Sequence, residues 1–317
     1  MHFLVTGGAG FIGSNIVSEL VAKGHQVRVL DNFTTGKMEN LAEVAGEIEI
    51  ISGDIRDYWT VSQAVQGIDY VLHQAALASV PRSIKNPLSS TVVNINGTLN
   101  VLEAARQAGV KKFVSASSSS VYGETEELPK HEAMVPSPLS PYAITKLANE
   151  FYCKVYWQLY QFPTVCLRYF NIFGPRQDPN GEYAAVVPKF VMAFSEDRSP
   201  TVFGDGGQSR DFTYIDNAVQ ANILAATNDD IAGEAFNVAC GAQFTLNDLL
   251  DKLRLIMGVN TPAKYVAPRL GDIRHSYASV DKLKAFGYKP SVNFEDGLRR
   301  TVEFFTQPNH HRTLAGK

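Results

Sequence analysis

The sequence predicts an α/β protein in which a doubly wound parallel sheet carries a smaller, mixed α/β lobe at its C-terminal side. Two observations predict the sheet. Short β-branched runs alternate with helix-length segments through the first half of the chain, and the first run ends in the glycine-rich turn TGGAGFIG. Such alternation is typical of parallel strands covered by helices on both faces. A third observation predicts the lobe, because turn sequences such as Gly204-Asp205-Gly206-Gly207 become frequent after about residue 172.

Six runs form the expected strands of the first half. In chain order they are Phe3–Thr6, Val27–Leu30, Ile48–Ile51, Tyr70–His73, Lys112–Ser115 and Thr164–Arg168. Between the fourth and fifth runs, Val92, Ile95, Leu99 and Leu102 recur at helical spacing. A helix is therefore expected around residues 92–105.

The chain is long enough for one large domain or two closely packed ones. We expect residues 1–172 to form a nucleotide-binding domain and residues 173–307 a substrate-binding lobe that includes a helix over Thr245–Met257. A strand-like stretch near 234–240 is expected to return to the main sheet. The polar residues 308–317 are expected to form a flexible tail.

Composition and charge exclude several classes of protein. The 29 basic and 32 acidic residues give a formal charge of −3, which offers no basic surface to nucleic acid or to an anionic membrane. No apolar run reaches the roughly 18 residues of a membrane span, and a strand-like run lies where a signal peptide would be. Cys153, Cys166 and Cys240 lie far apart and form no metal-ligating cluster. So sparse a set is typical of a reducing compartment, and a cytoplasmic protein without a metal centre is expected.

The glycine-rich turn predicts a dinucleotide site. Gly7, Gly10 and Gly13 follow the first strand and open a helix, so the backbone can bring a pyrophosphate close to the helix N-terminus. The second strand ends at Asp31, 18 residues after Gly13, where a carboxylate accepts hydrogen bonds from ribose hydroxyls and repels a 2′-phosphate. No arginine follows in DNFTTGK, although Lys37 is present. A Rossmann-type sheet is therefore expected, with NAD rather than NADP as its cofactor.

The stretch SPYAITK carries the expected chemistry. Tyr142 and Lys146 are four residues apart, so on a helix they share one face. A free tyrosine is a poor base with a pKa of about 10, but an adjacent ammonium group and a positive nicotinamide ring favour its phenolate form. Such a pair alone is common on helix surfaces, but after a complete dinucleotide motif it indicates an active site.

With these motifs the chain resembles the extended short-chain dehydrogenase/reductases, and among them the nucleotide-sugar epimerases of the UDP-glucose/UDP-N-acetylglucosamine 4-epimerase type. The resemblance extends from TGGAGFIG to about residue 305. Its further segments are HQAA (73–76), NINGTLNVLEAA (94–105), RYFNIFGPRQ (168–177), GQSRDFTYIDN (207–217) and RLGDIRHSYA (269–278). It implies NAD-dependent epimerisation at C4 of a UDP-hexose through a 4-keto intermediate, with NAD kept bound and recycled. It also implies a homodimer formed through helices near 88–107 and 141–160.

The resemblance gives a role to four consecutive serines. It places the family's catalytic serine at Ser118, 24 residues before Tyr142, with Ser117 bracing the backbone or the cofactor. Related dehydratases carry an Asp-Glu pair where this chain has Ser119 and Ser120. A serine hydroxyl does not ionise usefully near neutral pH and cannot act as that acid, so elimination chemistry is disfavoured.

The resemblance also assigns the other site residues, beside Tyr142, Lys146 and Ser118 as the catalytic set. The residues expected to bind NAD are Gly7, Gly10, Phe11, Ile12, Gly13, Asp31, Asn32, Gly36, Asp54, Ile55, Gln74, Ala75, Ala76, Asn94, Ser117, Tyr142 and Lys146. Those expected to bind the UDP-sugar are Ser79, Ser118, Tyr142, Asn171, Ala185, Val186, Thr201, Phe203, Arg210, Arg269, Asp272 and Ser276. In this set Arg210 and Arg269 clamp the phosphates, since a guanidinium offers a planar fork of donors.

Two of these assignments leave an alternative open. Asp54 and Ile55, at the end of the third strand, either contact the adenine or form a plain turn. Phe203 either stacks on the uracil or belongs to the core.

The size of the accepted sugar is expected to depend on Ser276. By the resemblance it stands four residues after Asp272, where relatives restricted to glucose and galactose have a bulky tyrosine. A serine leaves room for an acetamido group, and Ser79 lies in a stretch that resembles the N-acetyl-preferring relatives. Ala185 departs from the asparagine of glucose-restricted relatives. UDP-N-acetylglucosamine and UDP-N-acetylgalactosamine are therefore the expected pair, with UDP-glucose and UDP-galactose as further substrates.

Three alternatives stay open at the level of the sequence. Another nucleotide-sugar enzyme of the same family, either a dehydratase or a reductase, would share most of these motifs. A non-catalytic NAD-sensing protein on the same fold would share the cofactor motif, but such proteins commonly lose the tyrosine or the lysine, and Tyr142 and Lys146 are both present.

Overall fold

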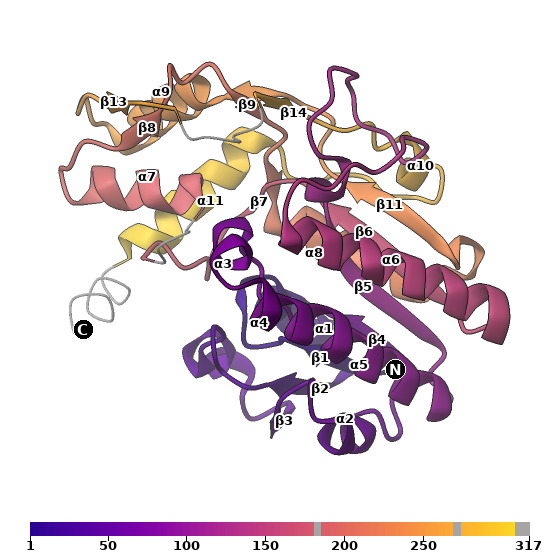
Figure 1. The fold of residues 1–317 in the computed structure, drawn as a ribbon. Helices are drawn as coiled ribbons and strands as arrows, with labels where there is room; N and C mark the ends of the chain where they lie inside the picture. The colour runs from indigo at the N-terminus through magenta and orange to yellow at the C-terminus, as the bar shows by residue number, and fades with distance from the viewer. Residues whose placement is uncertain (181–184, 269–273, 308–317) are drawn as a thin grey trace.

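The computed structural model describes residues 1–180, 185–268 and 274–307, with a large sheet layer and a smaller lobe above its edge (Figure 1). Seven strands form one sheet in the order β11-β6-β5-β4-β1-β2-β3, and all neighbouring strands in it are parallel. Their bounds are β1 His2–Thr6, β2 Gln26–Asp31, β3 Glu49–Ser52, β4 Tyr70–His73, β5 Lys112–Ser118, β6 Thr164–Tyr169 and β11 Glu234–Val238. The strand order reverses beside β1, where a doubly wound sheet binds its ligand.

Helices cover both faces of the sheet, as the sequence predicts. One face is covered by α1 (Phe11–Ala22) and α8 (Ile215–Thr227), and the other by α2 (Tyr58–Ala64), α5 (Thr98–Gln107) and α6 (Pro141–Tyr160). Alternate residues of one strand therefore enter different cores. Phe3 and Val5 of β1 pack with α1, while Leu4 packs with α2, α5 and α6.

The helix expected around residues 92–105 is present, but Val92–Gly97 at its start is π-helical rather than α-helical. The chain forms α3 (Val80–Lys85), α4 (Pro87–Thr91), one π-helical stretch (Val92–Gly97) and only then α5. In the wide turn the Asn94 carbonyl accepts hydrogen bonds from the Thr98 hydroxyl at 2.6 Å and from the Asn149 amide at 2.9 Å. Side-chain donors that insert at a helical carbonyl are a common cause of such a bulge.

Helix α6 is the longest element and carries the tyrosine and lysine of the SPYAITK motif. It begins after Ser140, whose hydroxyl accepts the Ala143 N–H at 3.2 Å, with Pro141 in the first turn. It ends at Gln161, which adopts a left-handed conformation. Since α6 packs along β5 and β6, its first two turns lie at the carboxyl ends of those strands.

The smaller lobe consists of short strands and helices. They are β7 Ile172–Phe173, α7 Val186–Ser195, β8 Thr201–Phe203, β9 Ser209–Arg210, β10 Thr213–Tyr214, β12 Phe244–Thr245, α9 Leu246–Met257, β13 Lys264–Val266, β14 His275–Ser276, α10 Asp281–Lys284 and α11 Phe294–Thr306. Between them the chain returns to the main sheet with α8 and β11. One apolar core runs from α1 and β1 into α7, α9 and α11, so the lobe is packed continuously onto the sheet layer. A domain boundary near residue 172 stays a proposal.

The described residues also include three short 3₁₀ segments, Met38–Val44, Ser119–Tyr122 and Asp229–Ile231. Within the described ranges, no helix combines the length and the apolar character that crossing a bilayer requires.

Candidate active site

A cavity of about 380 Å³ lies at the carboxyl ends of the central strands. Its walls come from the glycine-rich turn, the ends of β2 and β3, the segment after β4, the end of β5 and the start of α6. Of the 17 residues expected to bind NAD, 16 line it: Gly7, Gly10, Phe11, Ile12, Gly13, Asp31, Asn32, Gly36, Asp54, Ile55, Gln74, Ala75, Ala76, Ser117, Tyr142 and Lys146. The structure therefore brings residues that are far apart in the sequence together in the wall of one cavity.

The glycine-rich turn has the close packing that a dinucleotide cradle needs. Gly7 has a φ of 68°, and a Cβ there would lie 2.7 Å from the Ala75 nitrogen. A Cβ at Gly13 would overlap the Gly7 carbonyl oxygen. Only glycine fits either position, and the first residues of α1, Phe11, Ile12 and Gly13, line the cavity. These features fit the pyrophosphate of a bound dinucleotide.

Asp31 ends β2 beside this turn and is buried. Its two carboxylate oxygens accept the N–H groups of Ala9 at 2.9 Å and Phe33 at 2.8 Å. These bonds fix the carboxylate at the cavity wall, and each oxygen keeps a lone pair for a ribose hydroxyl. The carboxylate position therefore fits NAD.

Asp54 both forms a turn and lines the cavity, so neither alternative for it is excluded. It accepts the Arg56 N–H at 2.9 Å and a two-pronged bond from the Arg56 guanidinium. This pairing holds the pKa of the Asp54 carboxyl well below its ordinary value, with smaller help from Asn32.

Asn94 is the expected cofactor residue that does not line the cavity. It is fully buried, and its side chain binds both the N–H and the carbonyl of Leu77 and the hydroxyl of Thr145. Its role here is to hold the wall segment after β4.

Eleven further residues that we did not predict line the cavity. They are Leu30, Thr34, Thr35, Gly53, Arg56, Leu77, Ala78, Ser89, Val93, Ala116 and Tyr169. Of these residues, only Tyr169 could have been predicted from the sequence, because it directly follows the last predicted residue of a strand that neighbours β5. Its hydroxyl is bound to Gln74 and Asn222.

Tyr142, Lys146 and Ser118 meet at the start of α6. Tyr142 lies beside Ser118, whose hydroxyl lowers the pKa of the phenol, and the Lys146 Nζ lies 5.8 Å from the centre of the Tyr142 ring. The backbone of Tyr142 is fixed from outside the helix, because its N–H donates to the buried Ser83 hydroxyl at 3.0 Å. Lys146 donates to the Ala116 carbonyl at 2.7 Å. The helix spacing predicted from the sequence is thus confirmed as a shared face.

Burial has opposite effects on the charges of these two groups. It raises the pKa of Tyr142 to about 12, and the neighbouring Ser118 hydroxyl opposes this rise. It lowers the pKa of Lys146 to about 8, opposed by Cys166 and Glu150. Without further positive charge the pair therefore rests as a neutral phenol beside an ammonium group near neutral pH. A positive nicotinamide ring placed in the cavity would lower the pKa of the phenol.

The other three serines differ in environment. Ser117 is buried and donates to the Glu150 carboxylate at 2.5 Å. Ser119 and Ser120 are half-buried in the turn that follows β5, and the Ser120 N–H donates to Ser118 at 3.2 Å. Within the described part of the chain, the Ser120 hydroxyl is buried without a hydrogen-bond partner.

A second cavity, of about 650 Å³, lies in the smaller lobe. Five of the residues expected to bind the UDP-sugar line it: Asn171, Val186, Thr201, Phe203 and Arg210. Its wall also holds Lys189 and Arg198, which we did not predict. Asn171 has a φ of 39° and donates to the Asp211 carbonyl at 3.2 Å. The cavity thus combines basic side chains with the partly apolar strand β8, as a nucleotide diphosphate requires.

Of the remaining expected substrate residues, the structure does not bring Ser79, Ser118, Ala185 or Ser276 into the lining of either cavity. Ser276 is buried in β14, directly opposite Arg210 of β9. Ser79 precedes α3 and accepts the Arg82 N–H. Ala185 is exposed and precedes α7. Arg269 and Asp272 fall within 269–273 and lie outside the described residues.

Comparisons with known proteins agree with this geometry. Residues 3–239 match the model of the NAD dependent epimerase/dehydratase family. A structure of the UDP-N-acetylglucosamine 4-epimerase from Methanobrevibacter ruminantium, in complex with UDP-N-acetylmuramic acid, superposes with a TM-score of 0.92 at 42% identity. That match covers 96% of this chain and 97% of the other.

Two further similar proteins show the range of activities. The UDP-glucose 4-epimerase of Thermus thermophilus, solved with NAD, has a TM-score of 0.90 at 40% identity over 97% of this chain and all of the other. A dTDP-D-glucose 4,6-dehydratase from Mus musculus is 33% identical over 99% of this chain and 91% of its own length.

Proposed function

Because the chain belongs to the NAD-dependent epimerase/dehydratase family, we propose that it is a UDP-hexose 4-epimerase that interconverts UDP-N-acetylglucosamine and UDP-N-acetylgalactosamine. The observation that carries this proposal is that Tyr142 and Lys146 share one helix face in the wall of a dinucleotide cavity, with Ser118 beside Tyr142. NAD is the cofactor, and UDP-glucose and UDP-galactose are further substrates in the proposal.

The geometry supports the following mechanism. NAD, which the glycine-rich turn, Asp31 and Lys146 would hold in the cavity, would supply reversible hydride transfer at the sugar C4. Tyr142, as the phenolate, takes the proton of the 4-hydroxyl and gives it back when the hydroxyl re-forms. Ser118, which lies beside Tyr142, orients that hydroxyl. Lys146 stabilises the phenolate by its positive charge. The substrate passes through a 4-keto sugar that turns over within the site.

The larger cavity is the proposed site of the nucleotide. Arg210 binds the diphosphate as a two-pronged donor, while Asn171 contacts the diphosphate-sugar. The strand Thr201–Phe203 binds the uracil through its backbone. Arg269 and Asp272 belong to the same proposal by the family resemblance.

The proposed preference for acetylated sugars rests on Ser276. Its neighbour across the strand pair is Arg210, which lines the nucleotide cavity. A small side chain at this point leaves space for an acetamido group. Ser79 and Ala185 are proposed to lie around the same sugar.

A 4,6-dehydratase is the second candidate, because a dehydratase is among the similar proteins. That chemistry needs an acid to expel the 6-hydroxyl, and Ser119 and Ser120 stand at the two family positions for it. A reductase would consume free NADH, and a non-catalytic NAD-sensing protein would not need the Tyr142–Ser118 contact.

We also propose a homodimer, because exposed apolar side chains gather on α6 and its neighbour α4. These are Ile144, Phe151, Tyr152, Val155 and Leu159 on α6, with Leu88 on α4. A second copy of the chain would cover this stripe by pairing the same helices. A cytoplasmic location stays a proposal, based on the sparse and odd number of cysteines.

One experiment separates these functions. The purified protein is incubated with UDP-N-acetylglucosamine without added NAD, and the sugars are separated. Conversion to UDP-N-acetylgalactosamine with no net redox change is expected, because a recycled cofactor stays bound through purification. A strict need for stoichiometric NAD would indicate a dehydrogenase, and a 4-keto-6-deoxy product would indicate a dehydratase.

A further inference from the structure

Three residues of α6, one turn apart, lie against three consecutive residues at the end of β5. Tyr142 lies beside Ser118, whose hydroxyl lowers the pKa of the phenol. Lys146 donates to the Ala116 carbonyl at 2.7 Å. Glu150 accepts the Ser117 hydroxyl at 2.5 Å. Two of these contacts involve the proposed catalytic residues, whereas Glu150 lies on the far side of Lys146 from Tyr142.

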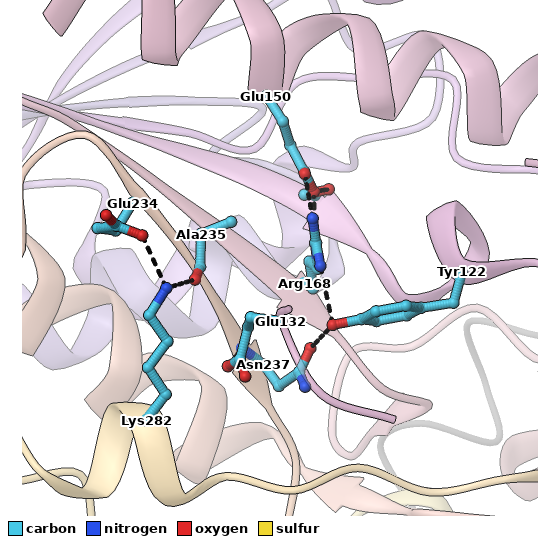
Figure 2. Close-up of polar contacts among 9 residues, drawn as sticks. Tyr122, Glu132, Glu150, Arg168, Glu234, Ala235, Asn237 and Lys282 are labelled. Carbon is cyan, nitrogen blue, oxygen red and sulfur yellow. Dashed lines mark hydrogen bonds and ion pairs between the residues drawn. The ribbon is translucent and has the colours of Figure 1, made fainter. Parts of the chain in front are cut away.

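Glu150 is itself held by a buried cation. The Arg168 guanidinium donates to its two carboxylate oxygens at 2.9 and 2.6 Å, and both side chains are less than a tenth exposed. Arg168 also donates to the Tyr122 hydroxyl at 2.9 Å, which in turn donates to Asn237 at 2.7 Å (Figure 2). Ser117, Arg168 and Asn237 are register partners across β5, β6 and β11, so their side chains leave the same face of the sheet.

We propose that Glu150 is a positioning residue of this active site: its carboxylate, fixed by Arg168, holds Ser117 and thereby sets the position of Ser118 and Ala116 relative to Tyr142 and Lys146. The inference rests on the proposed epimerase function. It adds Glu150, a residue that lines neither the cofactor cavity nor the nucleotide cavity.

Stability alone gives a weak reason for an ion pair at this place. A buried ion pair can often be replaced by apolar residues of similar size without loss of stability. Apolar residues at these positions could not, however, accept a hydrogen bond from Ser117. Because misplacement of a catalytic group by about 1 Å can cost roughly 100-fold in rate, a rigid anchor one residue from Ser118 serves the chemistry.

The carboxylate also influences the charge of Lys146. The ionisable groups around that ammonium are His73 on β4, Cys166 on β6, and Tyr142 and Glu150 on α6. Burial keeps His73 neutral, with a pKa lowered to about 3. The contact with Cys153, together with burial, raises the pKa of the Cys166 thiol. Glu150 therefore supplies negative charge that favours the protonated Lys146, and Arg168 balances the charge of Glu150.

The test uses Glu150→Gln in the full-length protein, loaded with its own NAD. We expect kcat to fall roughly 10- to 100-fold with a KM for the UDP-sugar close to that of the wild type. The alkaline limb of the kcat profile should move to lower pH, because Lys146 loses a neighbouring negative charge and faces an unpaired Arg168. Hydrogen exchange should accelerate at residues 116–119.

The matched control is Glu234→Gln. Glu234 and Arg168 line the same third cavity, of about 230 Å³, and Glu234 pairs with Lys282 at 2.8 Å without contacting β5 (Figure 2). This control should leave kcat, the alkaline limb and exchange at 116–119 as in the wild type. Equal losses in both variants would overturn the inference, as would a folded, NAD-loaded Glu150→Gln protein with an unchanged rate and alkaline limb.

A second variant decides the question if Glu150→Gln does not fold. Ser117→Ala keeps the ion pair and removes the anchoring bond, so it should lower kcat and accelerate exchange at 116–119 without moving the alkaline limb. An unchanged rate and unchanged exchange would overturn the inference. If the wild type shows no epimerase activity, the proposed function fails, and exchange at 116–119 in Glu150→Gln against Glu234→Gln still tests the anchor.

Discussion

At the scale of single residues, the site depends on the protonation state of one tyrosine. Burial raises the pKa of Tyr142 to about 12, so as it stands in the cavity wall the group is a phenol near neutral pH. The positive charges of Lys146 and of a bound oxidised nicotinamide act in the opposite direction. In the proposed mechanism, binding of the cofactor and activation of Tyr142 as the base are therefore coupled.

Tyr142→Phe should remove the base while leaving the nucleotide cavity intact. We expect kcat to fall by about 10²- to 10⁴-fold, because only the proton acceptor is lost, and the Kd for the UDP-sugar to stay close to that of the wild type. Steady-state kinetics and calorimetric titration measure the two quantities. Turnover near the wild-type rate would contradict the mechanism.

A second residue-scale prediction concerns the acetamido group. Ser276→Tyr should remove activity on the acetylated pair while sparing UDP-glucose, because a filled pocket excludes a larger substituent by steric clash. The measurement is kcat/KM for both sugar pairs, with Ser276→Ala as the control that keeps the space open. Parallel loss on both pairs would show that Ser276 does not determine the size of the sugar.

At the scale of elements, the sequence predicted the strands well and the helices less evenly. β1, β2, β3, β4 and β6 lie within one or two residues of the expected runs, because buried parallel strands are continuous apolar runs. β5 extends three residues further, to Ser118, since pairing with Arg168 and Tyr169 of β6 outweighs the poor strand propensity of serine. The bulge at Asn94 depends on Asn149, which is far away in sequence, so periodicity could not reveal it.

The same distinction applies to the site. Gly7, Gly13 and Tyr142 were predictable because local backbone or spacing requirements determine them. Arg56 and Tyr169 line the cavity only because the strand order places their segments at one edge. We expected Ser117 to brace the site, and in the structure its partner is Glu150. No local sequence pattern could identify this partner.

Asp211 connects three elements and makes the stability of this junction depend on pH. It follows β9, is fully buried, and accepts the N–H groups of Cys240 and Gly241 at 2.9 Å, and that of Ala278 at 3.4 Å beyond β14. Burial raises its pKa to about 6, and these backbone bonds oppose the rise. Since the folded state holds this proton more tightly than the unfolded state, the contribution is complete below about pH 4 and is lost as pH rises through 6.

Asp211→Asn should therefore remove one component of the pH dependence. The free energy of unfolding of the wild type relative to that of the variant should decrease as pH rises from about 4 to about 6, as denaturant titrations at several pH values would show. Asp251→Asn, a change at an exposed carboxylate on α9, is the matched control. A constant difference across this range would mean that Asp211 is ionised in the folded protein throughout.

At the scale of the whole molecule, one apolar core connects the sheet layer to the smaller lobe. Arg176 adds a polar connection, since it donates to the Ser14 carbonyl of α1 at 2.9 Å and to Glu43 at 3.0 Å. The two cavities are therefore held on one packed body. The active-site helix α6 faces the sheet with Lys146 and Glu150 and leaves its other side to solvent.

That outer side of α6 carries the last prediction, which concerns assembly. Phe151, Val155 and Leu159 are 58, 41 and 70% exposed along one stripe, a spacing suited to helix pairing, and an apolar patch of this kind marks an interface. Val155→Glu should convert a wild-type dimer to a monomer, because a carboxylate at the centre of the stripe would lose its water on pairing. Sedimentation velocity measures the change, and Leu255→Glu, an exposed apolar position on α9, should leave the dimer intact. A wild type that sediments as a monomer at micromolar concentration would contradict the proposed dimer. Because Glu150 and Lys146 lie on the same helix, a monomeric Val155→Glu protein with reduced kcat would further indicate that pairing stiffens the helix that positions the catalytic groups.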